Sequence, residues 1–425
     1  MKKGRVRALL PIGVFLASFL GMGLLSGDFN TMPAVVGFLI ALAVAFFQNP
    51  SLNFEEKIKV ITKGVGDENI ITMSLVFLAA GGFSGAVRAA GGVDSTVNFC
   101  LSILPSSVAV MGLMLIGCFI SLSMGTSMGT IAALSPIAAG ISEKTGFSAA
   151  LCIGAVVCGA MFGDNLSMIS DTTIAAVKTQ GCDMKDKFKA NFLIVLPAAV
   201  VSLLIFYLIT RHAEYTVSGD LEYHLLKILP YLIVLAGALI GFNVFAVLIS
   251  GTVLSLAVGV ATGEIGVFQI FTSVGDGVTG MYDITVISIL VACVVALMRE
   301  YGGIDCILYF IKKRIRGPKG AQVGIAVLTL LVDLATANNT VAIVIAGPIA
   351  KEVAHEYRIE PKRTASLLDI FASVGQGLLP YGAQLLLAAQ AAETAPFEIM
   401  PYLYYPWMMG ISALIFIFFG KQQKV

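Results

Sequence analysis

The 425-residue sequence predicts an all-α polytopic membrane protein. Hydrophobic residues make up 57% of the chain and charged residues 12%, whereas about a quarter of the residues in a soluble protein are charged. Long runs lack Asp, Glu, Lys and Arg altogether, among them 29–54, 101–142, 190–210 and 228–263. Because a spanning helix needs about 20 mostly apolar residues, each run can supply at least one crossing. The alternating pattern of barrel strands is absent.

Matching segments indicate that the chain consists of two related halves. "TSMGTIA" at 126–132 matches "TANNTVA" at 336–342, and "RAAGGVD" matches "REYGGID". Three further pairs keep the same order, and all five offsets lie between 209 and 212 residues. Shared membrane-helix composition alone would give no common offset. We therefore predict a duplication, with halves at 1–212 and 223–425.

Each half is predicted to contain five crossings and one hairpin. The stretch 105–141 is broken at "SMGTS" and has short arms, which favours a re-entrant hairpin with its tip at mid-membrane. If 105–141 formed two full crossings and not a hairpin, the number of crossings in the half would still be odd, so this alternative stays open. The corresponding hairpin of the second half is 320–354, and its broken helix is 364–393. The first half is expected to contain, in order, spans at 8–26 and 31–49, an interfacial helix at 53–69, a span at 70–88, the hairpin at 105–141, a broken helix at 147–178 and a span at 190–210.

The distribution of basic residues predicts the orientation. An odd number of crossings inverts the second half relative to the first. With the N-terminus inside, 23 of the 27 Lys and Arg residues fall on segments expected to be cytoplasmic. This asymmetry follows the positive-inside rule and places both termini in the cytoplasm. The basic and apolar N-terminus has no clear cleavage site, so we expect an uncleaved first span.

Four polar interruptions are the candidate functional segments: "SMGTSMGT", "FGDNLSMISD", "TANNT" and "SVGQGLLPYG". Inverted repeats with interrupted helices are typical of secondary transporters, which bind ions and substrates near the midplane. We expect the four segments to converge. Ser, Thr and Asn cap freed helix ends, and oxygen ligands suit a hard cation. The candidate ligands at matched positions are Thr126, Ser127 and Thr130 in the first half and Asn338, Asn339 and Thr340 in the second.

Two carboxylates, Asp164 and Asp171, lie within the apolar first half. A charge at the bilayer centre costs about 3 kcal/mol even on the scale derived from insertion experiments. The preceding uncharged run offers no Lys or Arg, so each carboxylate needs a proton, a cation or a partner from another segment. A carboxylate that holds either a proton or Na⁺ is a natural exchange element. We expect Asp164 and Asp171 to bind Na⁺; the alternative is that helix N-termini satisfy them as structural residues.

The second half is less acidic at the matching place. Gln376 stands where an equivalent of Asp164 or Asn165 would be expected. The buried acid of this half is Asp333, directly before "TANNT", and it is a candidate for the same site. Asp369 is expected to form a structural pair with Arg363, which is close in sequence.

Other function classes are disfavoured. No GxxxxGK loop is present, so ATP-driven pumping is not expected. The seven cysteines form no CxxC pair, which gives no indication of a metal site or a disulfide framework. No nucleophile–base pair suggests an enzyme, and the paired broken helices disfavour a channel or a scaffold protein. We expect no cofactor and no nucleic-acid partner.

The run "GTSMGTIAALSPIA … GAVVCGAMFGDNLSMISDTTI" resembles the NhaC-type sodium/proton antiporters of the ion-transporter superfamily. In that family a Gly-Thr-Ser break is followed by a "GD-x-x-S-x-x-SDTT" segment. The resemblance implies that the Asp, Ser and Thr positions face the cation, and that Asn165 keeps a polar contact. The matching residues are Gly125, Thr126, Ser127, Gly163, Asp164, Ser167, Ser170, Asp171, Thr172 and Thr173.

The resemblance implies exchange of Na⁺ for H⁺ across a bacterial inner membrane, and it allows a homodimer. Relatives of this type also exchange malate and lactate or carry amino acids. A Na⁺- or H⁺-coupled carrier of a small organic acid or amino acid is therefore the alternative. In the expected mechanism, hairpins and broken helices move together against a scaffold formed by the first two spans of each half.

Overall fold

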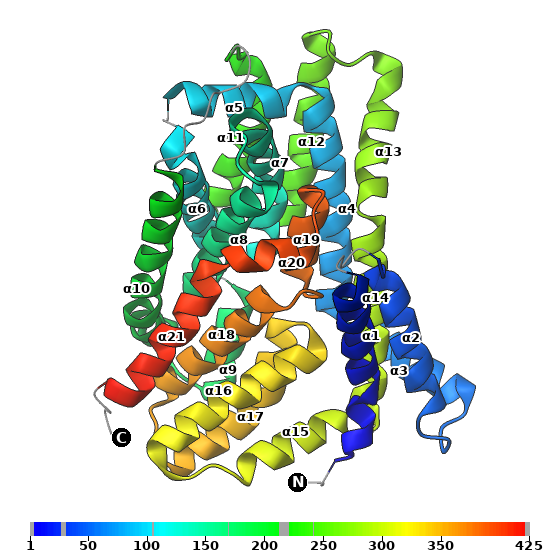
Figure 1. Cartoon of the computed structure of the whole chain (residues 1–425), viewed down its shortest axis with the longest axis vertical. Helices are drawn as coiled ribbons and strands as arrows, with labels where there is room; N and C mark the ends of the chain where they lie inside the picture. The colour runs from blue at the N-terminus through cyan, green and yellow to red at the C-terminus, as the bar shows by residue number, and fades with distance from the viewer. Residues whose placement is uncertain are drawn as a thin grey trace.

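The computed structural model describes residues 4–26, 31–103, 106–168, 170–211, 221–240 and 242–420. Within these ranges the elements are α-helices and short 3-10 helices, with no strand (Figure 1). Eight helices of the described part are long and apolar enough to cross a membrane, and the bent pair Pro396–Tyr402 and Tyr404–Phe419 would be a ninth. The prediction of an all-α polytopic membrane protein is confirmed. Two of the predicted crossings are apolar helices that are too short to be counted among these, Ala34–Phe47 and Leu225–Val234, which contributes to the difference from the ten predicted crossings.

The helices of the first half follow closely on one another. In chain order they are η1 Val6–Leu9, α1 Leu10–Ser26, α2 Ala34–Phe47, α3 Phe54–Val65, α4 Glu68–Ala89, α5 Gly92–Ile103, α6 Ser106–Met124, α7 Ser127–Thr145, α8 Ala149–Leu166, α9 Asp171–Gln180 and α10 Met184–Thr210.

The second half has a similar succession. Its elements are α11 Leu225–Ile240, α12 Val244–Ala261, η2 Val267–Gln269, α13 Ile270–Gly280, α14 Tyr282–Glu300, α15 Gly303–Lys312, α16 Gly317–Thr336, α17 Asn339–Glu356, α18 Pro361–Leu378, α19 Ala383–Ala391, α20 Pro396–Ile399, η3 Met400–Tyr402 and α21 Tyr404–Phe419. The predicted boundary between the halves lies mostly at 212–220, outside the described residues.

Both helical hairpins turn with the same backbone geometry. α6 and α7 are separated by Gly125, and α16 and α17 by Ala337; both residues have positive φ angles, of 68° and 48°. The next residue caps the following helix in each case: Thr126 has φ −153° and ψ 124°, and Asn338 has φ −151° and ψ 112°. Each side chain accepts a hydrogen bond from the backbone N–H three residues on, which satisfies a free donor at the helix start.

The two broken helices also match. α8 ends at Leu166 and α9 begins at Asp171, while α18 ends at Leu378 and α19 begins at Ala383. These ends are 212 positions apart, as are the cap residues of the two hairpins. The recurring geometry is what a duplication would produce. The domain boundaries and the inverted relation of the halves stay predictions.

The broken helices form the centre of the bundle. In the broken helix Ala149–Gln180, 89% of the most apolar 18-residue stretch is buried. In Pro361–Ala391 the buried share of the corresponding stretch is 83%. The corresponding value for Met184–Thr210 is only 33%, so this helix lies at the periphery. α6 packs on α8 through Gly159 and Gly163: a Cβ added there would lie 2.2 Å and 2.4 Å from backbone atoms of α6. Small residues permit this close approach of helices in a membrane.

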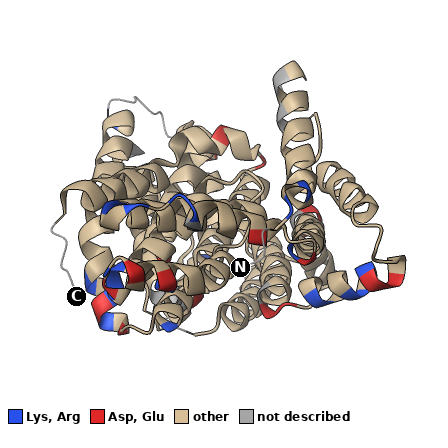
Figure 2. Ribbon diagram, turned by 90° about the horizontal axis from the view of Figure 1, so that it is seen from below, with Lys and Arg blue, Asp and Glu red and all other residues tan. Residues whose placement is uncertain are grey.

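The hairpins enter the bundle from opposite ends. α6 and α7 extend from the upper end of the molecule in Figure 1, and α16 and α17 from the lower end. α5 lies across the upper end and α15 across the lower end. The markers of both chain ends lie at the lower end, which Figure 2 views from below; there Lys and Arg positions are interspersed with Asp and Glu positions.

Candidate ion-binding site

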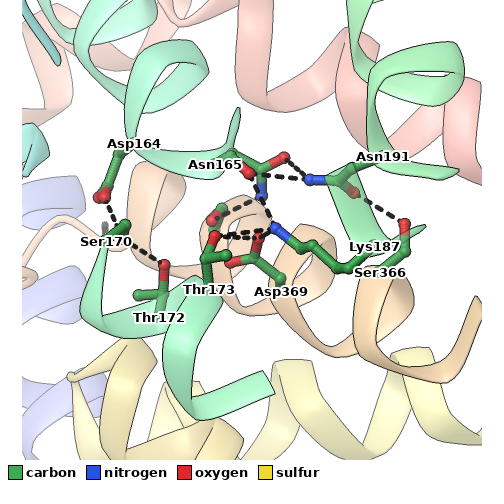
Figure 3. Close-up of polar contacts among 10 residues, drawn as sticks. Asp164, Asn165, Ser170, Thr172, Thr173, Lys187, Asn191, Ser366 and Asp369 are labelled. Atoms are coloured by element: carbon green, nitrogen blue, oxygen red, sulfur yellow. Dashed lines mark hydrogen bonds and ion pairs between the residues drawn. The ribbon is translucent and has the colours of Figure 1, made fainter. Parts of the chain in front are cut away.

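Asp164 lies at the C-terminal end of α8, where two helix breaks meet. Its exposed fraction is only 5%. One carboxylate oxygen accepts a hydrogen bond from Ser127 Oγ at 2.7 Å, and the other accepts one from Ser170 Oγ at 2.6 Å. Ser127 is the first residue of α7, and Ser170 is the cap of α9. The Ser170 hydroxyl is also 2.9 Å from Thr172 Oγ1 (Figure 3).

The hydrogen-bond chain continues into the second half. Gln384 Nε2 donates to Ser127 Oγ at 3.2 Å, and Gln376 Nε2 donates to Gln384 Oε1 at 2.6 Å. Gln376 lies in α18 and Gln384 in α19, one on each side of that break. Three of the four interruptions are therefore linked to one carboxylate. Gln384 was not among the predicted residues, because it lies past the interruption in an apolar helix. Its place in the first turn of α19, beside a predicted break, could have indicated it.

The fourth interruption contacts the other aspartate. Thr340 Oγ1 donates to Asp171 Oδ2 at 3.4 Å, and Asn339 Oδ1 accepts from the Thr340 backbone N–H at 3.0 Å. Asp171 is exposed, in contrast to Asp164. The two aspartates thus lie in different surroundings, on the two sides of the break between α8 and α9.

Three candidate ligands make local backbone contacts. Thr126 and Asn338 are the hairpin caps described above, and Thr130 Oγ1 donates to the carbonyl of Thr126 at 2.9 Å. Among the described residues, none of the three is hydrogen-bonded to Asp164. Their oxygens hold the turn at the hairpin tips.

Asp333 is a separate buried carboxylate, in the last turn of α16. It is fully buried, and neither of its carboxylate oxygens has a hydrogen-bond partner among the described residues. It packs on α18 at Gly375, where an added Cβ would lie 2.4 Å from Asp333 Oδ2. Only glycine leaves room for this side chain.

A buried ion pair lies next to the site. Lys187 of α10 and Asp369 of α18 form an ion pair with exposed fractions of 1% and 0%. Lys187 Nζ also donates to the carbonyl of Asn165 at 3.0 Å and to Thr173 Oγ1 at 2.8 Å (Figure 3). The ammonium group therefore sits at the carbonyl end of α8, where the helix dipole favours a positive charge.

The predicted pairing of Asp369 with Arg363 is wrong. Six residues along a helix correspond to a rotation of about 240°, so the two side chains leave α18 on different faces. Arg363 Nε instead donates to Gln322 Oε1 at 3.0 Å, and its guanidinium lies 4.2 Å from the Phe416 ring centroid. Lys187 was missed because nothing in the sequence brings α10 next to α18.

Asn165 is held by the neighbouring helices. Asn191 Nδ2 donates to the carbonyl of Asn165 at 2.8 Å and to its Oδ1 at 2.6 Å. Ser366 Oγ donates to Asn191 Oδ1 at 2.7 Å, and Asn165 Nδ2 donates to Ser373 Oγ at 3.2 Å. Asn165 thus links α8 to α10 and α18, while its neighbour Asp164 faces the hydroxyl groups (Figure 3).

The donors around Asp164 define the type of cation that the site could hold. In the part of the chain that the structure describes, no three His, Cys, Asp or Glu side chains gather at one point. A cation at Asp164 would depend on one carboxylate, hydroxyl and amide oxygens and the freed carbonyls of the breaks. Such a set suits a hard cation that keeps an all-oxygen shell.

A bundle of broken helices around a buried carboxylate is typical of secondary membrane transporters. A model of the Na⁺/H⁺ antiporter family matches residues 6–208 and 220–421. The chain belongs to this family, and the resemblance noted in the sequence is confirmed.

Individual relatives are distant but match over nearly the full length. The chain is 21% identical to a "Malate-2H(+)/Na(+)-lactate antiporter" of Bacillus subtilis, over 99% of this chain and 97% of that protein. It is 23% identical to the "Na(+)/H(+) antiporter NhaC" of Alkalihalophilus pseudofirmus, over 97% and 94% of the two chains. A solved structure, the YdaH transporter of Alcanivorax borkumensis, matches with a TM-score of 0.41 and 15% identity, over 86% of this chain and 89% of that chain.

Proposed function

We propose that this protein exchanges Na⁺ for H⁺ and that Asp164 is the carboxylate that both ions share. The observation that supports this most is that Asp164 is buried where two helix breaks meet, and that its hydrogen-bond partners among the described residues are neutral. A buried carboxylate without a cationic partner requires a bound proton or cation. Because a hydroxyl can donate to a carboxylate or turn its lone pairs to a cation, the same shell serves either ion.

The neighbouring ion pair explains why Asp164, and not Asp369, would exchange ions. Lys187 supplies Asp369 with a cation that is part of the chain. Among the described residues Asp164 has no cationic partner, so a mobile ion would fill this role. A Na⁺ ion bound at Asp164 excludes the proton, and a proton bound there excludes Na⁺. This competition couples the two fluxes.

The remaining predicted residues take supporting roles in the proposal. Asp171, with Thr340 and Asn339 beside it, is the more exposed carboxylate and would receive the ion on its way to or from Asp164. Ser170 and Thr172 are proposed as hydroxyl ligands on the side of α9. The other candidates would act through the shape of the breaks or as a second buried acid: Thr126, Thr130, Asn165, Asp333, Asn338 and Gln376.

We place the protein in the bacterial inner membrane with both termini in the cytoplasm. The support is the concentration of 23 of 27 basic residues on segments of one predicted side. The hairpins and broken helices would move as a unit against the first two spans of each half. A homodimer is part of the same proposal, because the family resemblance allows it.

The test is sodium-driven proton movement in proteoliposomes loaded with a pH-sensitive dye. A Na⁺ pulse should change the lumenal pH with the wild type, and Asp164→Asn should abolish the response. Asp276→Asn is the matched control, since Asp276 is exposed on α13, and it should behave like the wild type. Full exchange by Asp164→Asn would contradict the assignment.

A coupled carrier of an organic acid or amino acid is the second candidate. Gln376 and Gln384 place amide groups beside the Asp164 network, and amides can donate to a substrate carboxylate. A relative that matches 99% of this chain is named as a malate and lactate antiporter. If a Na⁺ pulse moves no protons, uptake of labelled malate, lactate or amino acids in the same vesicles would favour this candidate.

A further inference from the structure

A large cavity lies apart from the Asp164 network. It has a volume of about 650 Å³ and opens between α10, α16, α18 and α21. Leu193, Phe416 and Ile417 give it an apolar wall. None of the residues proposed for ion exchange lines it, so exchange at Asp164 leaves the cavity without a role.

The polar lining of the cavity is mainly basic. The basic lining residues are Lys189, Arg358, Lys362 and Arg363, and the acidic ones are Asp186 and Glu360. Glu360 is engaged by Lys362 at 3.2 Å. Arg363 stacks on Phe416, and its buried Nη1 has no hydrogen-bond partner among the described residues. The cavity thus offers uncompensated positive charge next to an aromatic and aliphatic wall.

The position of the cavity matches the boundary between the membrane core and its surface. Its lining residues include the start of α18, the first turns of α10 and the last turn of α21, and these segments lie toward the lower end of the molecule in Figure 1. Farther along α10 and α21, large apolar side chains are exposed, among them Leu196, Val200, Ile411 and Ile415. This outer surface is suited to acyl chains, and it continues into the apolar wall of the cavity.

We propose that this cavity binds the phosphate head group of an anionic phospholipid from the leaflet at that end. Arg363, Lys189 and Lys362 would contact the phosphate, and the acyl chains would lie along α10 and α21. Basic pockets between membrane helices bind anionic head groups through charge-assisted hydrogen bonds. The apolar wall favours a lipid over free phosphate, because a soluble anion would leave that wall exposed to water.

The experiment measures lipid binding by the full-length protein in a neutral detergent. Phosphatidylglycerol and phosphatidylcholine are titrated separately, with thermal unfolding and native mass spectrometry as readouts. Phosphatidylglycerol should raise the Tm and remain bound, whereas phosphatidylcholine with the same chains should do neither. Arg363→Gln should weaken phosphatidylglycerol binding by about tenfold or more, as expected for the loss of a charged hydrogen bond.

Controls separate the head-group contact from general effects. Lys185→Gln removes an exposed charge from α10, the helix that carries Lys189, outside the cavity, and should bind like the wild type. If Arg363→Gln does not fold, Lys189→Gln/Lys362→Gln tests the rim of the cavity instead. Equal responses to both lipids, or unchanged binding by the rim variant, would overturn the proposal. An equal Tm increase with inorganic phosphate alone would also overturn it, in favour of a soluble anion.

Discussion

Asp164 and Asp369 are two buried carboxylates held in opposite ways, although they lie in neighbouring helices. Hydroxyl groups surround the first, and an ammonium group neutralises the second. Removing one partner of a buried ion pair leaves a charge without compensation, which typically destabilises a protein by about 3–5 kcal/mol. The difference between the two sites can therefore be tested residue by residue.

Lys187→Met should destabilise the fold strongly, because Asp369 would remain buried without its cation. We expect a loss of about 3–5 kcal/mol, measured as a lower Tm in detergent. Lys187→Met/Asp369→Leu removes both charges and should recover most of the loss. A single variant as stable as the wild type would show that the ion pair contributes nothing.

Ser127→Ala should weaken Na⁺ binding without unfolding the protein. The variant removes one hydroxyl from the shell of Asp164, and a hydrogen bond to a charged group is typically worth about 1.5–3 kcal/mol. The apparent KM for Na⁺ in exchange assays should therefore rise at least about tenfold. Ser102→Ala is the control, since Ser102 is exposed on α5 and its hydroxyl donates to the carbonyl of Phe99 in the same helix. Wild-type KM values for Ser127→Ala would exclude Ser127 from the shell.

At the scale of elements, the polar segments of the sequence predicted the breaks well. "SMGTSMGT" contains the turn at Gly125, "TANNT" contains the turn at Ala337, and the two longer segments contain the gaps before Asp171 and Ala383. These breaks are local, since Gly, Ser and Asn lower the cost of ending a helix. Partners from other helices, such as Lys187, could not be predicted, because they depend on which helices pack together.

The packing of α6 on α8 gives a prediction about the support of the site. Gly159→Ala would place a Cβ 2.2 Å from the carbonyl oxygen of Met114, so the two helices would have to separate. Overpacking typically costs about 1–3 kcal/mol, and Asp164 lies only five residues farther along α8. We expect a lower Tm together with reduced exchange.

The matched control is Gly275→Ala in α13. An added Cβ at this position meets no atom within 4 Å, and alanine is the better helix former. Stability and exchange should both be preserved. Equal effects of the two substitutions would show that the contact between α6 and α8 does not support the site.

For the whole molecule, sharing of one carboxylate predicts how pH affects Na⁺ transport. Protons compete with Na⁺ at Asp164, so the apparent KM for Na⁺ should rise as the pH falls. On the acidic side of the transition the increase should approach about tenfold per pH unit. The maximal rate at saturating Na⁺ should change less. The measurement is the initial exchange rate as a function of Na⁺ concentration at several pH values. A KM for Na⁺ that does not depend on pH would point to separate sites for the two ions.

The membrane class and the family could be predicted for the whole chain, because hydropathy and the Asp164 segment suffice for them. The contacts between halves could not. Gln384 and Ser366 become neighbours of the site only when helices from both halves pack together, and Asn191 does so only when α10 packs on α8. Their types are ordinary for membrane helices, so nothing in the sequence distinguishes them from polar residues that merely join helices.

The ion pair of Lys187 and Asp369 also affects how the protein responds to voltage. A charge that crosses the entire membrane field exchanges about 2.3 kcal/mol per 100 mV. Because the ammonium and the carboxylate are joined, they would travel as a neutral unit if α10 and α18 moved together. The pair would then add no net charge to the moving helices, and the membrane potential would do no net work on it. The covalently attached cation thus removes Asp369 from the charges on which the membrane potential acts.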